Sequence, residues 1–467
     1  MINIEEFISK QYNMLIAPAG YGKTHTISEC LKETDGKQLI LTHTHAGVAS
    51  LKEKVKKANI LPSKYRIETI TSFAQKYVLA FCTKDDIPKQ EDSKVYYPFL
   101  VKEATLLVKK KLIKNIIKNS YSGVFVDEYQ DCSIEQHELI WEIAQVLPTR
   151  LLGDHMQGIF DFNSSTIVDL ECSILMRDFY NNQEVLETPW RWIIGGNESL
   201  GEDLKAIRGK LVNKENIDLR QFPSIEFSKT EETRLKTTAI YKIIGEEDSL
   251  LIIHPITNNI NPRVKLIQTF RGRLRLMEPI DSKDFYFLSK LCDSITSENL
   301  ILKTKELSLR LFNKTEINKW FNNKGLKRKV KEDEKLHTQA LKEIANAFSG
   351  ERKGIVQLLQ KIKALPNVKC YRIELYNSLL NALNEADTNE TTVYQAMIKN
   401  RNMVRCIGRK VYGKYVGTTL LTKGLEFDTV IVVEADKFEC PKHLYVALTR
   451  ASKRLIVYSK NDILNVY

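Results

Sequence analysis

The stretch Ala17-Pro18-Ala19-Gly20-Tyr21-Gly22-Lys23-Thr24 decides the fold. Its first two residues end a short apolar run, residues 14–18, and a helical pattern follows it, so it predicts a turn between a strand and a helix. Glycines in such a turn let backbone N–H groups close around a phosphate, and the start of the helix faces the anion. The alternative is a tight turn with a chance Gly-Lys-Thr.

The same loop predicts which residues bind the nucleotide. Lys23 would reach the β- and γ-phosphates, and the Thr24 hydroxyl would bind Mg²⁺. The set of expected nucleotide-binding residues in this loop is Ala17, Gly20, Gly22, Lys23 and Thr24.

An acid pair, Asp127-Glu128, follows a second apolar run at residues 123–126. In a doubly wound sheet the tip of a buried strand lies beside the phosphate loop. We therefore expect Asp127 to hold Mg²⁺ and Glu128 to orient and deprotonate the attacking water. An acidic pair at a strand end could instead cap the next helix. Together the loop and the pair predict hydrolysis of a nucleoside triphosphate with Mg²⁺.

Short apolar runs alternate with helical patterns along much of the chain. Strands are predicted at 38–44, 149–154, 249–255, 429–436 and 453–459, and helices at 46–58 and 134–147. This alternation predicts an α/β fold with parallel sheets covered on both faces. A length of 467 residues is too great for one hydrophobic core.

Domain boundaries are predicted where the alternation breaks. A lysine-rich helical stretch interrupts it at 76–120, and a longer, mostly helical region does so at 281–405. We read both regions as insertions. The expected division is a first core at 1–75 and 121–186, a small helical insertion at 76–120, a second core at 187–280 and 406–467, and a helical insertion at 281–405.

Composition narrows the class of protein. The net charge of +12 favours a polyanion partner because phosphate neutralisation releases counterions, although a basic soluble protein would also fit. None of the eight cysteines forms a CxxC pair, which argues against zinc or a disulfide framework. With no signal-like or membrane-length apolar stretch, we expect a cytoplasmic protein. The basic run 324–335 is expected to be a solvated helix or loop.

Several segments resemble motifs of UvrD/Rep-like superfamily 1 helicases, in the family's order. Asp127-Glu128-Tyr129-Gln130-Asp131 is similar to DExxQD, and residues 152–162 (LGDHMQGIFDF) resemble GDxxQxIYxF. Lys423 with residues 424–428 (GLEFD) and residues 444–451 (LYVALTRA) resemble two later motifs. Weaker matches lie at 42–46 (THTHA), 69–73 (TITSF) and 189–192 (PWRW).

The resemblance implies two RecA-like cores with ATP between them. Arg191 and Arg450 would bring positive charge to the γ-phosphate from the second core, as phosphoryl transfer requires. Gln157 would link the γ-phosphate to the neighbouring core, and Glu426 would accept a hydrogen bond from the ribose. Trp190 would stack on the base. The alternative for each arginine is a surface salt bridge.

The resemblance also implies a track for single-stranded DNA across both cores. Phe160 and Phe162 stand where the family stacks aromatic rings on bases, a contact that tolerates any sequence. His43, Thr44 and Phe73 would line the same track. The two phenylalanines could instead be core residues after a strand.

The leading hypothesis is an ATP-dependent DNA helicase or translocase moving 3′ to 5′ on single strands. The second is an ATP-binding, DNA-sensing regulatory subunit that controls a separate nuclease, because compact UvrD-like proteins of this kind occur in antiphage systems such as Gabija. A small-molecule P-loop kinase is disfavoured by the later motifs. No nuclease-like acidic cluster follows Arg450, so no fused nuclease is expected.

Overall fold

A computed structural model describes residues 2–83, 86–88, 92–159, 167–229, 233–277, 283–407 and 412–467. The chain divides into two compact units. The first comprises Met1–Thr257, Arg405–Gly413 and Thr418–Tyr467, and the second comprises Asn258–Val404 and Lys414–Gly417.

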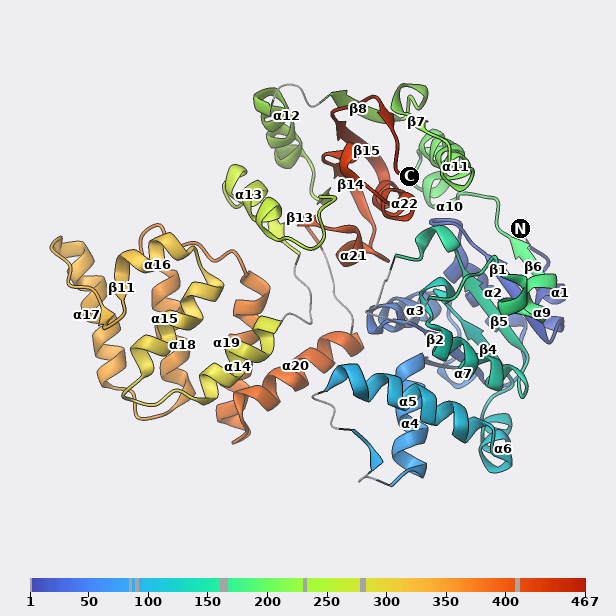
Figure 1. Ribbon diagram of the computed structural model, residues 1–467, viewed down its shortest axis with the longest axis horizontal. Helices are drawn as coiled ribbons and strands as arrows, with labels where there is room; N and C mark the ends of the chain where they lie inside the picture. Colours follow the sequence, from blue (N-terminus) through green and yellow to red (C-terminus); the bar gives the residue numbers. More distant parts are fainter. Residues whose placement is uncertain are drawn as a thin grey trace. The chain divides into compact units, whose positions relative to one another are not determined.

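The first sheet has six parallel strands in the order β3-β2-β4-β5-β1-β6 (Figure 1). Their bounds are β1 (Tyr12–Ile16), β2 (Gln38–Thr42), β3 (Tyr65–Thr69), β4 (Gly123–Val126), β5 (Thr149–Gly153) and β6 (Gln183–Val185). Every residue of β2, β4 and β5 is buried, as parallel strands covered on both faces require. The order places the carboxyl ends of β1, β5 and β4 next to one another.

Helices accompany the strands of the first sheet. They are α1 (Ile4–Ser9), α2 (Lys23–Glu33), α3 (His45–Lys57), α7 (Ile134–Ala144), α8 (Ser173–Met176) and α9 (Asp178–Asn181). Ser133 and Gln136 form a capping box at the start of α7, which fixes where that helix begins after the acid pair.

The region of the small insertion is helical. It contains the second half of α4 (Ile70–Phe81), then α5 (Ser93–Val108) and α6 (Lys111–Ser120). Leu100, Ala104 and Ile117 belong to the same buried cluster as Val124 of β4. These helices therefore extend the core of the first sheet.

A second parallel sheet has the order β10-β13-β9-β14-β15-β8. Its strands are β8 (Ile225–Lys229), β9 (Leu250–Ile253), β10 (Arg275–Leu276), β13 (Lys414–Gly417), β14 (Phe427–Val432) and β15 (Ala451–Ser459). Accompanying helices in the first unit are α10 (Trp190–Ile194), α11 (Glu198–Val212), α12 (Thr233–Glu246), α21 (Thr419–Thr422) and α22 (Pro441–Leu448). The predicted α/β class with two RecA-like parallel sheets and helical insertions is confirmed.

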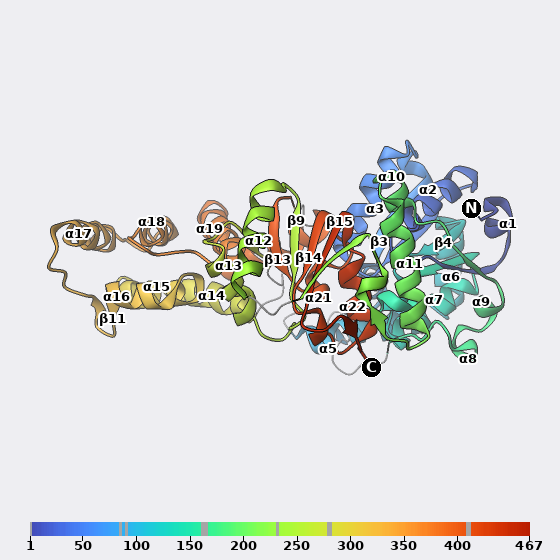
Figure 2. The same ribbon diagram turned by 90° about the horizontal axis from the view of Figure 1, so that it is seen from above.

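The second unit is mostly helical (Figure 2). Its helices are α13 (Asn261–Thr269), α14 (Lys283–Asp293), α15 (Leu300–Leu311), α16 (Lys314–Trp320), α17 (Glu332–Asn346), α18 (Arg352–Lys363), α19 (Ile373–Thr388) and most of α20 (Val393–Ile407). Leu307, Leu359 and Leu379 lie in its own buried cluster. A two-stranded hairpin, β11 (Phe321–Asn322) and β12 (Gly325–Leu326), joins α16 to α17.

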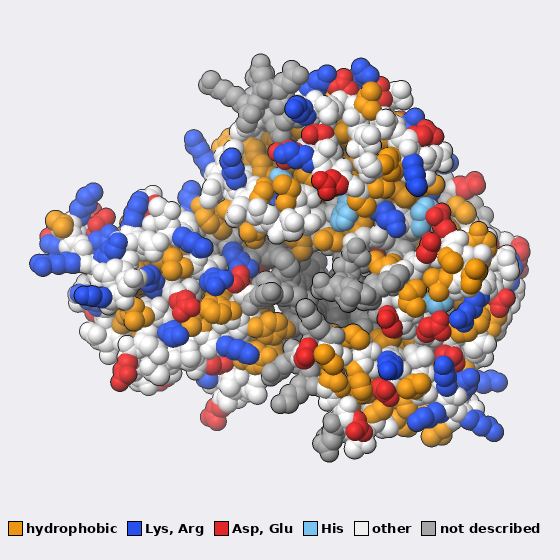
Figure 3. Space-filling view, in the orientation of Figure 1, with side chains coloured by type: hydrophobic (Ala, Val, Ile, Leu, Met, Phe, Trp, Pro, Cys, Tyr) orange, Lys and Arg blue, Asp and Glu red, His pale blue; other side chains and the backbone are white. Residues whose placement is uncertain are grey.

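The basic run 324–335 is largely exposed and ends in the first turn of α17. Lys329 lies over the Trp320 ring at 4.1 Å and pairs with Glu334. Lys and Arg side chains gather over this end of the second unit on the face that Figure 3 shows. This agrees with the expected solvated segment. Among the described helices, none has the length and apolarity needed to cross a membrane.

Candidate nucleotide-binding and hydrolysis site

The phosphate loop joins β1 to α2, and its shape depends on two glycines. Gly20 and Gly22 have φ values of +78° and +90°, a region that other residues adopt only with strain. A Cβ on Gly20 would lie 2.9 Å from Trp192, and one on Gly22 would lie 3.3 Å from Trp190. Two tryptophans of α10 therefore pack directly on the loop, and α2 begins at Lys23 with its N-terminal amides at the anion position.

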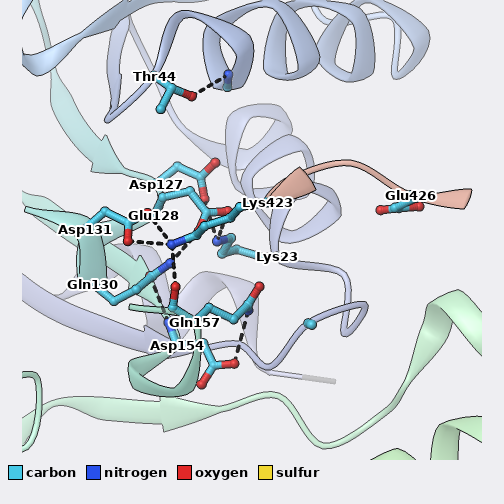
Figure 4. A network of polar contacts seen from close by, with 12 residues as sticks. Lys23, Thr44, Asp127, Glu128, Gln130, Asp131, Asp154, Gln157, Lys423 and Glu426 are labelled. Atoms are coloured by element: carbon cyan, nitrogen blue, oxygen red, sulfur yellow. Dashed lines mark hydrogen bonds and ion pairs between the residues drawn. The ribbon is translucent and has the colours of Figure 1, made fainter. Parts of the chain in front are cut away.

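Lys23 joins the loop to the acid pair at the end of β4 (Figure 4). Its Nζ atom lies 3.2 Å from Oδ1 of Asp127 and 2.6 Å from Oε1 of Glu128. Burial alone would lower the pKa of Lys23, but the two carboxylates outweigh burial and raise it. Burial favours the neutral form of Glu128, yet Lys23 and Lys423 hold its pKa at about 2. Both partners of this pair are charged at neutral pH.

The segment after β4 connects to the segment after β5. Glu128 has a left-handed backbone, and its carboxylate accepts a hydrogen bond of 2.5 Å from the Gln130 amide. The Gln130 carbonyl accepts from the backbone N–H of Asp154 at 3.0 Å. The carboxylate of Asp154 accepts from the Gln157 side chain at 3.1 Å. Glu128 and Gln157 thus belong to one hydrogen-bonded network.

The two predicted arginines differ in their surroundings. Arg191 pairs with Glu426 at 2.6 Å and donates to the Thr449 carbonyl at 2.5 Å. Arg450 is 2% exposed and donates to the carbonyls of Val446 and Leu425. Burial, with a contribution from Arg191, lowers the pKa of Arg450 to about 10. The guanidinium of Arg450 is therefore bonded to backbone carbonyls, whereas Arg191 is bonded to both the Thr449 carbonyl and the Glu426 carboxylate.

Segments near the second sheet also contact the segments that follow β1, β4 and β5. The Nζ atom of Lys423 lies 2.5 Å from the Asp131 carboxylate and also donates to the Gln157 carbonyl. The Tyr445 hydroxyl accepts from the backbone N–H of Ala19 at 3.3 Å. Sequence reasoning noted Lys423 only as part of a motif, because residues 292 positions apart give no local sign of pairing.

The predicted DNA-binding residues differ in burial and in hydrogen bonding. His43 is partly buried, and its pKa is lowered to about 4, mainly by burial and also by Lys423. The Thr44 hydroxyl caps α3 by accepting from the Gly47 N–H at 3.0 Å. Phe73 is fully buried against Tyr77 in the first core, so its ring offers no face to a base. Phe160 and Phe162 lie outside the described residues.

The donor set fits Mg²⁺ with a nucleotide. Among the described residues, no three His, Cys, Asp or Glu side chains form a metal-binding group. Magnesium bound with nucleotides instead uses one or two protein oxygens together with phosphate oxygens. Asp127 offers a carboxylate at the loop, and Thr24 offers a hydroxyl in the first turn of α2. The glycine loop and Lys23 supply the amides and the cation that a triphosphate requires.

Two protein families match this chain. Residues 2–163 match the family described as AAA domain, and residues 415–458 match UvrD-like helicase C-terminal domain. The Gabija protein GajB of Bacillus cereus is 22% identical over 371 residues, which cover 76% of this chain and 67% of that protein. The RecBCD enzyme subunit RecB of Buchnera aphidicola is 28% identical over 138 residues, covering 28% of this chain and 11% of that protein.

The phosphate loop, the acid pair and the two parallel sheets define an ATP-dependent, helicase-like protein. The first family match covers the phosphate loop and the acid pair, and the second covers Lys423, Glu426 and Arg450. These matches support a likeness of this chain to UvrD/Rep-like helicases.

Proposed function

We propose that this chain hydrolyses ATP to move along single-stranded DNA in the 3′ to 5′ direction. The observation that carries the proposal is the Lys23 ion pair with Asp127 and Glu128, beside which the Lys423–Asp131 pair joins the two halves of the nucleotide site. Within this proposal the first core spans 1–75 and 121–186, and the second spans 187–280 and 406–467. The helical insertions are 76–120 and 281–405.

A change of partner at Lys23, from Glu128 to the phosphates, would promote hydrolysis. Lys23 now holds down the pKa of Glu128. When Lys23 turns to the phosphates, Glu128 loses that stabilisation and becomes a stronger base for the attacking water. Thr24 and Asp127 would hold Mg²⁺, which neutralises phosphate charge when it is bound.

Cations from the second core would complete the site. Arg191 would exchange Glu426 for the γ-phosphate, leaving Glu426 to accept from the ribose. Arg450, held by hydrogen bonds to the Val446 and Leu425 carbonyls, would supply a fixed positive charge. Trp190, which packs on Gly22, stands close enough to the loop to stack on the base. Gln157 would sense the γ-phosphate.

Three features support the proposed DNA binding. They are the likeness to UvrD/Rep-like helicases, the net charge of +12, and the position of His43 and Thr44 after β2. Phe160 and Phe162 remain proposed stacking residues on the basis of their motif. The buried Phe73 is not included.

Displacement of streptavidin from biotinylated single strands tests movement and its direction. A 3′ to 5′ motor removes streptavidin from the 5′ end in the presence of ATP, and Lys23→Ala does not. Removal only from the 3′ end would reverse the proposed direction. Retention of streptavidin at both ends, with wild-type protein bound to the strand, would contradict autonomous movement.

A second function is favoured by the similarity to the Gabija protein GajB over most of both chains. In this alternative, the chain binds ATP and DNA and controls a separate nuclease in antiphage defence. Mixing the purified chain with a nuclease encoded beside it distinguishes the two functions. ATP-dependent control of cleavage without streptavidin displacement would favour the regulatory subunit, whereas displacement without any effect on cleavage would favour the motor.

A further inference from the structure

A buried ion pair links the nucleotide site to α11. Nη2 of Arg208 lies 2.9 Å from Oδ1 of Asp154. The Asp154 side chain is completely buried, and that of Arg208 is 18% exposed. Arg208 lies outside every motif that the sequence analysis identified.

The two oxygens of Asp154 have separate partners. Oδ1 accepts from Arg208 and from the backbone N–H of Met156 at 3.1 Å. Oδ2 accepts from the Gln157 amide at 3.1 Å. Arg208 therefore fixes the carboxylate in an orientation that leaves Oδ2 facing Gln157. The labelled side chains in Figure 4 show Asp154 and Gln157 joined in this way beside Gln130.

The same aspartate reaches the acid pair. Its backbone N–H donates to Gln130, which donates to Glu128. Displacing the segment that begins at Asp154 would disturb both Gln157 and Glu128, because hydrogen-bonded networks respond as a unit.

Charge gives Arg208 a second effect. Without Arg208, the buried Asp154 carboxylate would lose its cation, which would change its bond to Gln157. Arg208 also interacts electrostatically with Tyr445 of α22 and with Tyr21 of the phosphate loop. The pair thus lies between α11, α22 and the loop.

We propose that Arg208 is a positioning residue for γ-phosphate recognition. It holds Asp154 so that the Gln157 amide is presented to the γ-phosphate, and it thereby couples α11 to the nucleotide state. The inference rests on the proposed nucleotide function of this site.

The test compares the binding of ADP with that of a non-hydrolysable ATP analogue by equilibrium fluorescence titration. We expect Arg208→Gln to reduce the preference for the analogue about tenfold, as losing one charge-assisted hydrogen bond would. The dissociation constant for ADP should change little. Gln157→Ala should have the same effect, and combining it with Arg208→Gln should add little, because both act through one contact.

Two further variants separate positioning from folding. Arg208→Lys keeps the charge and should retain part of the preference. Lys205→Gln, on the exposed side of α11, should behave as wild type. Equal losses of ADP and analogue binding in Arg208→Gln, with a lowered melting temperature, would reduce Arg208 to a structural role and overturn the inference.

The same titrations distinguish failure of the inference from failure of the proposed function. If Arg208→Gln keeps the wild-type preference for the ATP analogue over ADP, and DNA stimulates hydrolysis by the wild type, only the inference is overturned. If Arg208→Gln loses the preference for the ATP analogue, and DNA does not stimulate hydrolysis by the wild type, the inference is supported and the proposed motor function is contradicted. Wild-type protein that binds neither nucleotide contradicts both.

Discussion

Nζ of Lys23 lies 2.6 Å from Oε1 of Glu128, so the lysine of the phosphate loop neutralises the residue proposed as the general base. In the proposed function, a nucleotide competes with this ion pair for the lysine, so binding of ATP and release of Glu128 would be coupled. This relationship leads to predictions about affinity, rate and stability.

Glu128→Gln should leave binding of an ATP analogue unchanged or make it tighter. The substitution removes one of the two carboxylates that hold Lys23, and Asp127 remains at 3.2 Å. Equilibrium titration measures the affinity, with Lys23→Ala as the control that should lose binding. Clearly weaker binding by a folded Glu128→Gln protein would show that the ion pair does not compete with the nucleotide.

Arg191→Ala and Arg450→Ala should differ in stability. Arg450 is buried with its guanidinium bonded to backbone carbonyls, so its removal leaves unsatisfied acceptors and a cavity. We expect a loss of about 2–4 kcal/mol in the free energy of unfolding for Arg450→Ala. Arg191→Ala should cost about 1 kcal/mol or less, because its pair with Glu426 is partly exposed. Denaturant unfolding measures both, and a larger loss for Arg191→Ala would contradict this account.

Lys423→Met should destabilise the protein by about 3–5 kcal/mol, because it leaves the 2%-exposed Asp131 carboxylate without its cation. Lys423→Met combined with Asp131→Asn should recover most of the loss. The matched control is Lys57→Ala, which breaks an exposed pair with Glu53 and should cost about 1 kcal/mol at most. A similar loss for the single and double variants would exclude the unpaired carboxylate as the cause.

His43 should make stability depend on pH. Its pKa is about 4 in the folded chain against an ordinary 6.5, so the unfolded chain takes up a proton first as the pH falls. The stabilisation is complete above pH 6.5 and is lost as the pH falls from 6.5 towards 4. His43→Gln should show a shallower loss than wild type over this window in chemical unfolding. Parallel curves for the two proteins would contradict the shifted pKa.

Local patterns sufficed to predict much of the fold. The apolar runs before Gly20, Asp127 and Asp154 predicted three neighbouring strands because burial on both faces gives continuous hydrophobic sequence. β3 and β6 escaped prediction, since Tyr65–Thr69 and Gln183–Val185 contain charged or polar residues at sheet edges.

Long-range pairs could not be predicted in the same way. Arg208 and Asp154 are 54 positions apart, and nothing in the sequence around Arg208 distinguishes it from the other basic residues of α11. Phe73 illustrates the opposite difficulty. Its motif suggested a DNA contact, whereas packing within the cluster that includes Tyr77 and Leu100 buries its ring.

The most direct test of the central claim is steady-state ATP hydrolysis by the purified chain with and without single-stranded DNA, alongside Glu128→Gln. We predict that DNA strongly stimulates hydrolysis and that the substitution lowers the stimulated rate by about 10²–10⁴-fold. Hydrolysis that stays at background with DNA present, or that persists in Glu128→Gln, would contradict an ATP-driven motor built on the Lys23–Glu128 site.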